Sequence, residues 1–303
     1  MRNRQALHPH VNATLRLGQG NLCRKCNAVA DGWDGIDDGA VGAGLYCAPM
    51  LTDLCCPVLE LRQYTLHPGQ RDVLIRLFDR EFVETQEAVG MRVVGQFRDM
   101  DDPDRFVWVR GFRDMAARAE ALAAFYGGPV WARHRDAANA TMIDSDDVLL
   151  LRPVDDRSGF PLPGVANPGA AAELDRPPVH ATAVPRSLVT ATIYYKDHPV
   201  DDEFVRFFDQ SVRPVMVDTG AAPLACLQTE TSQNTFPALP VRTGENVFVW
   251  FSRFTSLDQY RDHLARLAQS TEWTEAVLPE LSKYLTARPT RLRLAPTARS
   301  LLR

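Results

Sequence analysis

Lysine is scarce in this sequence of 303 residues, since only Lys25, Lys196 and Lys283 stand among its 34 basic residues. The arginines are dispersed among an excess of aspartate and glutamate, and the formal net charge is −4. A nucleic-acid-binding protein would instead gather its basic residues into a patch or a stripe. The composition therefore argues against nucleic acid as a partner.

Long apolar runs are missing as well. No run of about 18 apolar residues is present, so we expect no membrane span. The N-terminus lacks the apolar core of a secretory signal. Five of the six cysteines precede Pro57, which leaves the rest of the chain with Cys226 alone. We therefore expect a folded body without a disulfide, in the reducing cytoplasm.

Residues 1–57 differ from the rest of the chain. Glycine and aspartate are frequent in residues 31–44, which show no hydrophobic period. We therefore expect residues 1–57 to form a disordered N-terminal extension. Cys23 and Cys26 form a C-x-x-C pair, with Cys47, Cys55 and Cys56 after it. A zinc ribbon needs a second pair of this kind, so we predict no metal site.

One strand pattern of alternating aromatic and apolar residues occurs twice. Residues 105–112 read RFVWVRGF, and residues 247–254 read VFVWFSRF, with Trp108 aligned on Trp250. Such alternation predicts a half-buried strand. Its recurrence predicts a duplicated domain.

The first copy spans residues 58–154. Four segments are the expected strands, from their period-two alternation: 58–66, 91–98, 105–112 and 147–154. Helical spacing of apolar residues predicts one helix over 70–89. It predicts another from Asp114, a suitable N-cap, to 142, interrupted at Gly127 and Gly128. The order β-α-β-β-α-β is that of a ferredoxin-like domain.

The second copy spans residues 188–296 and follows a linker. Residues 155–187 contain six prolines and no periodic pattern, as expected of a linker. The hairpin loop at residues 232–245 is longer than its counterpart in the first copy. We predict an α+β fold of two tandem ferredoxin-like (βαββαβ) repeats, which pair sheet to sheet as an intramolecular α+β barrel.

The predicted site lies inside this barrel. We expect Leu59, Leu61 and Ile193 to face the helices, which leaves the intervening polar and aromatic residues for the interior. A small-molecule pocket needs aromatic walls around a few polar groups. The predicted ligand-binding residues are Arg62, Tyr64, Trp108, Arg110, Tyr194 and Trp250. These side chains could also simply fill the barrel and pair among themselves.

The catalytic candidates are His67, Arg62 and Arg110. His67 ends the first strand at a corner where it could act as a base, and the arginines could stabilise developing negative charge. His198 occupies the matching corner of the second copy, although a His-Pro pair at a surface turn needs no function. No P-loop, nucleophile elbow, Rossmann glycine run or H-E-x-x-H motif occurs, and we predict no cofactor.

Three segments of the first copy resemble the NIPSNAP family: residues 60–69 (ELRQYTLHPG), 125–142 (FYGGPVWARHRDAANATM) and 149–153 (LLLRP). The resemblance covers residues 58–154, and the second copy looks like a more divergent version. It implies a dimeric α+β barrel fold, formed here within one chain by tandem domains. It implies no settled activity and brings no catalytic residues.

The function we predict is the binding of a small, largely apolar molecule inside the barrel, with or without chemistry of a cofactor-free oxygenase or isomerase. The alternative is a non-catalytic protein-interaction module, whose partner would contact an outer helical face or residues 1–57. A haem protein would need a proximal histidine, for which His67, His198 and His263 are the candidates. The chain could also form a homo-oligomer.

Overall fold

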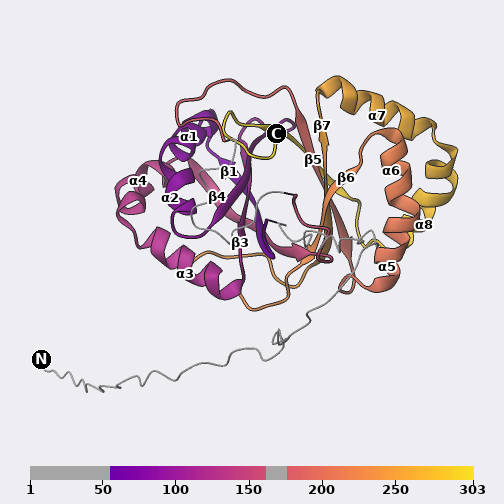
Figure 1. Cartoon of the computed structure of the whole chain (residues 1–303), viewed down its shortest axis with the longest axis horizontal. Helices are drawn as coiled ribbons and strands as arrows, with labels where there is room; N and C mark the ends of the chain where they lie inside the picture. The colour runs from indigo at the N-terminus through magenta and orange to yellow at the C-terminus, as the bar shows by residue number, and fades with distance from the viewer. Residues whose placement is uncertain (1–54, 162–175) are drawn as a thin grey trace, which may run out of the picture. The chain divides into compact units, whose positions relative to one another are not determined.

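The computed structural model describes residues 55–161 and 176–303 (Figure 1). The predictions made for residues 1–54, including those for Cys23 and Cys26, lie outside the described residues, as do those for residues 162–175. Within the described ranges, no helix is long and apolar enough to cross a membrane.

The first half of the described chain runs from β1 to β4. Its strands are β1 (Val58–Leu66), β2 (Arg92–Asp99), β3 (Arg105–Phe112) and β4 (Met142–Pro153). Its helices are α1 (Arg71–Leu77), α2 (Val83–Glu87), α3 (Met115–Tyr126) and α4 (Pro129–Asn139). A π-helical segment, η1 (Phe78–Phe82), joins α1 to α2.

The second half runs from β5 to β8. Its strands are β5 (Leu188–Lys196), β6 (Pro223–Thr229), β7 (Asn246–Phe254) and β8 (Thr290–Pro296). Its helices are α5 (Asp202–Phe207), α6 (Arg213–Thr219), α7 (Leu257–Gln269) and α8 (Leu278–Lys283). Two π-helical segments join them, η3 (Phe208–Val212) between α5 and α6 and η4 (Glu272–Val277) before α8.

Local sequence signals account for most of these boundaries. The predicted bounds of β1 and β3 are confirmed. The side chain of Asp114 accepts a hydrogen bond from the Ala117 N–H at 2.7 Å, so it caps α3 as predicted. β4 begins earlier than predicted, because Thr65 and Leu66 extend its pairing to Asp144 and Met142 across two register shifts.

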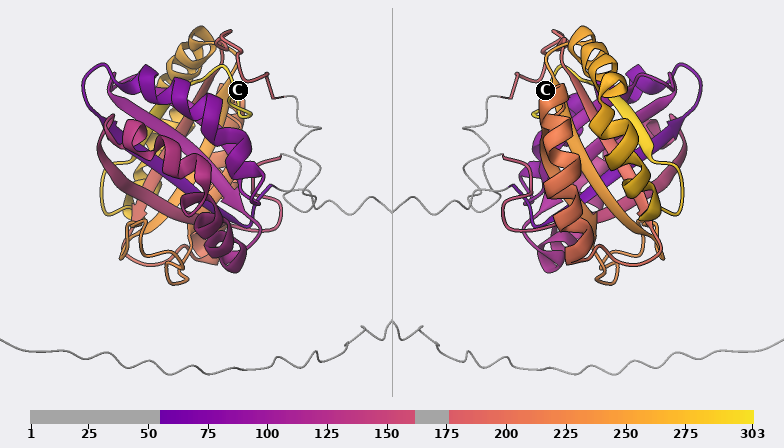
Figure 2. Two further views of the ribbon diagram at one scale, coloured as in Figure 1. Left: turned by 90° about the vertical axis from the view of Figure 1, so that its left-hand side faces the viewer. Right: turned by 90° about the vertical axis from the view of Figure 1, so that its right-hand side faces the viewer.

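Eight strands close into one antiparallel barrel, in the order β1-β3-β2-β8-β5-β7-β6-β4. The two halves join through the pairs β2–β8 and β4–β6, where Phe97 lies opposite Pro296 and Leu151 lies opposite Thr229. Figures 1 and 2 show the helices of each half outside its own strands. The predicted α+β barrel is confirmed, and its closure leaves no sheet edge free.

Apolar side chains from all eight strands fill the interior of the barrel. Phe97, Val107 and Phe251 belong to this cluster, and each is 0% exposed. An eight-stranded barrel is just wide enough for its own side chains to fill. Two further apolar clusters lie in the outer layers, one between the strands and helices of each half.

The predicted orientation of the strands is wrong. Leu59, Leu61 and Ile193 belong to the interior cluster, whereas Tyr64 and Trp108 pack against the helices of the first half. Both faces of the strands are covered, so alternation alone does not reveal which face is which. The closed interior offers a charged side chain no water and few partners, and burying an unpaired charge costs several kcal/mol, about 3–5 when one partner of a pair is removed.

The barrel interior also contains Cys55 and Cys56, which are bonded to each other and each 1% exposed. The Cys55 N–H donates a hydrogen bond to the Phe160 carbonyl oxygen at 3.1 Å. The folded body therefore contains one disulfide, contrary to the expectation from sequence.

Gly95 tests how tightly the interior is filled. It lies at a register shift in the β2–β3 pairing, and a Cβ there would stand 2.4 Å from Cζ of Phe97. Gly95→Ala should therefore lower the free energy of unfolding by about 1–3 kcal/mol through overpacking, measured by urea denaturation. The cost of Gly95→Ala should be smaller when it is measured in a Phe97→Leu background, where the colliding ring is absent. Equal losses with and without Phe97→Leu would show that the collision is absent.

Candidate ligand site in the first half

The structure divides the predicted ligand-binding residues between two layers. Arg62, Tyr64, Trp108 and Arg110 lie together under the helices of the first half. Tyr194 and Trp250 pack under the helices of the second half. The prediction that these six residues line one site inside the barrel is therefore wrong, because the apolar interior separates the two layers.

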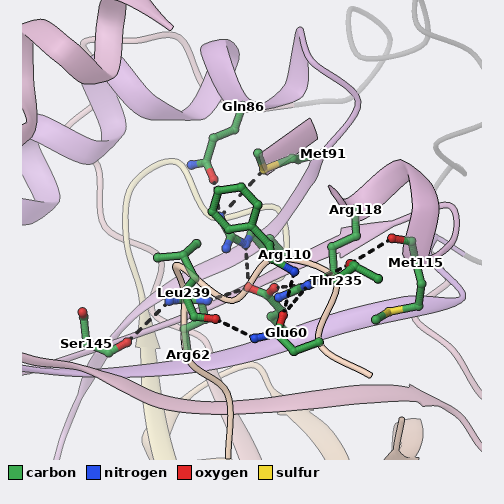
Figure 3. Close-up of polar contacts among 12 residues, drawn as sticks. Glu60, Arg62, Gln86, Met91, Arg110, Met115, Arg118, Ser145, Thr235 and Leu239 are labelled. Carbon is green, nitrogen blue, oxygen red and sulfur yellow. Dashed lines mark hydrogen bonds and ion pairs between the residues drawn. The ribbon is translucent and has the colours of Figure 1, made fainter. Parts of the chain in front are cut away.

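A buried carboxylate organises the polar part of the first layer. Glu60 Oε2 accepts hydrogen bonds from Arg62 Nη1 and from Arg110 Nε, both at 2.7 Å. Glu60 Oε1 accepts one from Arg118 Nε at 2.7 Å. Figure 3 shows these three guanidinium groups converging on the carboxylate. We call these four residues the Glu60 cluster.

Register explains why these side chains meet. Glu60 on β1 lies directly opposite Arg110 on β3, and Arg62 lies opposite Trp108. Arg118 reaches the cluster from α3, where it shares the buried face with Ala121, Leu122 and Phe125. Sequence analysis missed the part played by Arg118, although its helical spacing from these apolar residues was a usable signal.

The Glu60 cluster carries more positive than negative charge. Burial alone would raise the pKa of Glu60, but the charges of Arg110, Arg62 and Arg118 outweigh it and hold that pKa well below its usual range. Glu60 is therefore an ionised hydrogen-bond acceptor and a very weak base. Since the three arginines are 0–1% exposed, two positive charges in excess of the carboxylate are buried here.

Some donors of this layer have no acceptor. Arg110 Nη2, Arg118 Nη2 and Trp108 Nε1 are buried and make no hydrogen bond. The guanidinium of Arg110 lies over the Trp108 ring, 5.0 Å from its centroid. Such cation–π contacts offset part of the burial of a charge but do not satisfy its N–H groups.

An aromatic cavity of about 30 Å³ adjoins the cluster. Its walls come from β1, β3, β4, η1 and the four α-helices of the first half: Tyr64, Leu74, Phe78, Phe82, Gln86, Trp108, Phe125, Tyr126, Trp131, Ala138 and Met142. Gln86 is the link to the cluster, because its Oε1 accepts a hydrogen bond from Arg110 Nη1 at 3.3 Å. A cavity of this size holds roughly two water molecules.

The wall contributed by α4 has few fully buried side chains. Ala138 is the one residue of α4 that is fully buried, and Trp131 contacts the rings of Phe82, Phe125 and Tyr126 from a half-exposed position. Two glycines, at positions 127 and 128, separate α4 from α3. Elements with few buried contacts open at the lowest free energy.

A loop from the second half covers the site. Within this covering loop, residues 232–245, Asn234 Oδ1 and Thr235 Oγ1 accept hydrogen bonds from Arg118 Nη1 at 2.9 and 3.2 Å. The ring of Phe236 stacks on Tyr126, with centroids 6.1 Å apart. The loop that sequence analysis recognised as longer in the second copy therefore completes the first half.

The second half lacks the charges of the Glu60 cluster. Thr190 lies opposite Ser252, in the pairing that Glu60 and Arg110 make in the first half. Ser252 Oγ donates to the Ala221 carbonyl oxygen at 2.7 Å. The two layers therefore differ in polarity, although their strands pair alike.

The predicted histidines do not join the site. His67 and His198 are exposed, and no described contact links His67 with Arg62 or Arg110. His263 is buried in the second half, where burial lowers its pKa to about 4 and its Nδ1 lies 3.0 Å from Thr219 Oγ1. Among residues 55–161 and 176–303, no group of His, Cys, Asp and Glu is arranged to hold a metal ion.

The family model that matches the chain is NIPSNAP, over residues 59–156. An uncharacterised NIPSNAP-like domain protein from Burkholderia xenovorans is 26% identical and covers 35% of this chain and 90% of its own, with a TM-score of 0.32. A protein from Fusobacterium nucleatum, provisionally named a monooxygenase, is 9% identical over 80% of this chain and 93% of its own, with a TM-score of 0.45.

A dye-decolorizing peroxidase from Bacteroides thetaiotaomicron is 12% identical over 82% of this chain and 96% of its own, with a TM-score of 0.45. No curated protein matches the chain. These structural likenesses are too distant to transfer an activity. The sequence match shows that residues 59–156 form a NIPSNAP domain.

Replacing Glu60 should have a large effect on stability. Glu60→Gln leaves three buried guanidinium groups without a negative charge, so the free energy of unfolding should fall by about 3–5 kcal/mol. Because the folded pKa of Glu60 lies below the unfolded 4.5, its contribution is present above that pH and is lost in acid. The deficit should therefore shrink as the pH falls. Glu120→Gln, on the exposed face of α3, should change stability little, and equal effects of the two variants would contradict the role given to Glu60.

Asp79 in η1 should give the opposite pH dependence. Burial raises its pKa to about 6, against the charges of Arg299 and Arg176, and its Oδ1 accepts a hydrogen bond from Gln96 Nε2 at 3.1 Å. An acid whose pKa is higher in the folded than in the unfolded chain stabilises the fold when it is protonated. For Asp79 this stabilisation is complete below pH 3.8, the pKa in the unfolded chain, and is lost as the pH rises through 6.

Asp79→Asn keeps the oxygen acceptor and removes the titration. By chemical denaturation, the variant and the wild type should be similar at pH 4. At pH 7.5 the variant should be more stable by up to about 3 kcal/mol. Parallel stability curves across this range would show that Asp79 does not titrate as described.

Proposed function

Residues 59–156 of this chain form a NIPSNAP domain, and we propose that the protein binds a small, largely apolar molecule in the outer layer of its first half. The observation that carries this proposal is the aromatic cavity beside buried donors that have no acceptor, notably Trp108 Nε1. Aromatic walls around a few unpaired polar groups are what a small-molecule site requires.

The barrel interior is not the site that we propose. Its side chains are apolar and 0–5% exposed, so they offer a ligand neither space nor an orienting hydrogen bond. The cavity beside Trp108 is lined by both aromatic and polar side chains, although its volume is only about 30 Å³. A molecule larger than water enters when α4 moves outward, which its single fully buried residue and the preceding glycines favour.

The chemistry that this layer supports is the stabilisation of negative charge. Arg110 adjoins the cavity through Gln86 and Trp108, and a preorganised guanidinium in a dry site stabilises a developing anion. A cofactor-free oxygenase whose substrate enters already ionised fits this arrangement. An isomerase needs a proton acceptor, and the lining residues include neither a histidine nor a carboxylate.

The architecture that we propose is a tandem duplication. Residues 58–154 and 188–296 would be two ferredoxin-like repeats, with residues 155–187 as linker and 1–57 as an extension. Both halves have the strand order 4-1-3-2 in their own numbering, and a π-helical segment begins at Phe78 in one and Phe208 in the other. Two sheets of this kind cover each other's exposed faces.

The alternative function, a protein-interaction module, finds less support. The large apolar side chains that are exposed in the described residues are scattered over different elements: Val73, Met100, Ile143, Val184, Val217 and Leu278. Single exposed apolar residues are normal on a folded surface, whereas an interface gathers them into one patch.

Trp131→Ala tests where the ligand binds. The truncation enlarges the aromatic cavity, so indole should raise the melting temperature of this variant more than that of the wild type, as expected when a ligand binds the folded state. Trp273→Ala is the matched control, because Trp273 is the half-buried tryptophan of the second layer. It should respond to indole like the wild type. An equal response of both variants, or none, would refute the proposed site.

A further inference from the structure

The charges of the Glu60 cluster are not balanced by the protein. Among the described residues, Glu60 is the one carboxylate that pairs with Arg62, Arg110 or Arg118. All four side chains are 0–1% exposed, so water does not solvate the excess charge. Removing charge from water is expensive unless an opposite charge is nearby. A second anion would supply the balance.

Two nitrogen atoms of the cluster are available to such an anion. Arg110 uses Nε for Glu60 and Nη1 for Gln86, and Arg118 uses Nε for Glu60 and Nη1 for the covering loop. In both, Nη2 is buried and has no acceptor. Carboxylates are the usual acceptors for guanidinium N–H groups.

Arg110 lies next to the aromatic cavity, against the rings of two of its lining residues. Its guanidinium carbon is 5.0 Å from the centroid of the Trp108 ring and 6.0 Å from that of Tyr126, and both rings line the cavity. Figure 3 shows Arg110 between Gln86 and Glu60. A molecule in the cavity would therefore have this charge beside it, behind Gln86 and Trp108, and aromatic rings elsewhere.

We infer that the ligand is an organic monocarboxylate whose apolar body occupies the aromatic cavity and whose carboxylate binds the free N–H groups of Arg110 and Arg118. This inference deepens the proposed function and depends on it. The covering loop positions Arg118, because Asn234 and Thr235 accept hydrogen bonds from its Nη1. The second half supplies this loop, and in its own layer Thr190 and Ser252 stand where the first half has Glu60 and Arg110.

The test compares benzoate with its neutral isostere benzamide by calorimetric titration. Wild-type protein should bind benzoate at least about tenfold more tightly, the effect of one charge-assisted hydrogen bond. Arg110→Gln should remove most of this preference, leaving only the part that Arg118 Nη2 contributes, and should keep the binding of benzamide. It leaves Glu60 two guanidinium partners, so the variant should fold. Arg110→Lys should keep part of the preference, because lysine retains the positive charge but lacks the planar guanidinium with its several N–H donors.

Lys196→Gln is the control, since Lys196 is a buried cation of the second layer, over the rings of Phe204 and Tyr284. It should leave the preference for benzoate unchanged. Equal binding of the two probes by wild-type protein would overturn the inference and leave the proposed function standing. Binding of neither probe would overturn both. A preference that survives Arg110→Gln and disappears in Lys196→Gln would place the anion in the other layer.

Discussion

A closed eight-stranded barrel gives its interior no water, and the placement of charge in this protein depends on that constraint. Residues alternate along β1, so Leu59 and Leu61 fill the interior while Glu60 and Arg62 point to the helices. The helical layer can receive them because Gln86, Arg118 and the covering loop bring hydrogen-bonding groups to the same place. The polar cluster is thus a consequence of the dry barrel and lies outside it.

The two halves have the same pairing of strands and different contents. Glu60 and Arg110 in the first correspond in register to Thr190 and Ser252 in the second. The long loop after β6 reaches the first half, where Phe236 packs on Tyr126. One half therefore contains the charged site and the other helps to close it. A complete site needs both halves, which accounts for their presence in one chain.

Sequence reasoning located the strands of the first half better than it oriented their faces. Apolar alternation located β1 and β3 to the residue, and the long second loop was recognised. Both faces of each strand are buried, so the pattern could not say whether Leu59 or Arg62 faced inward. The hydrogen bonds that join Glu60, Arg118 and Asn234 could not be predicted. These side chains are far apart in sequence, and the closed barrel brings them together.

In the function that we propose, small-molecule ligands bind between the sheet and the helices of the first half and not within the barrel. A crystal of the full chain soaked with 4-bromobenzoate tests it directly, because the bromine is located by anomalous scattering. The account predicts one bromine peak among Trp108, Phe125 and Trp131, with the carboxylate against Arg110. A peak among Phe97, Val107 and Phe251 inside the barrel, or one under the helices of the second half, would contradict it.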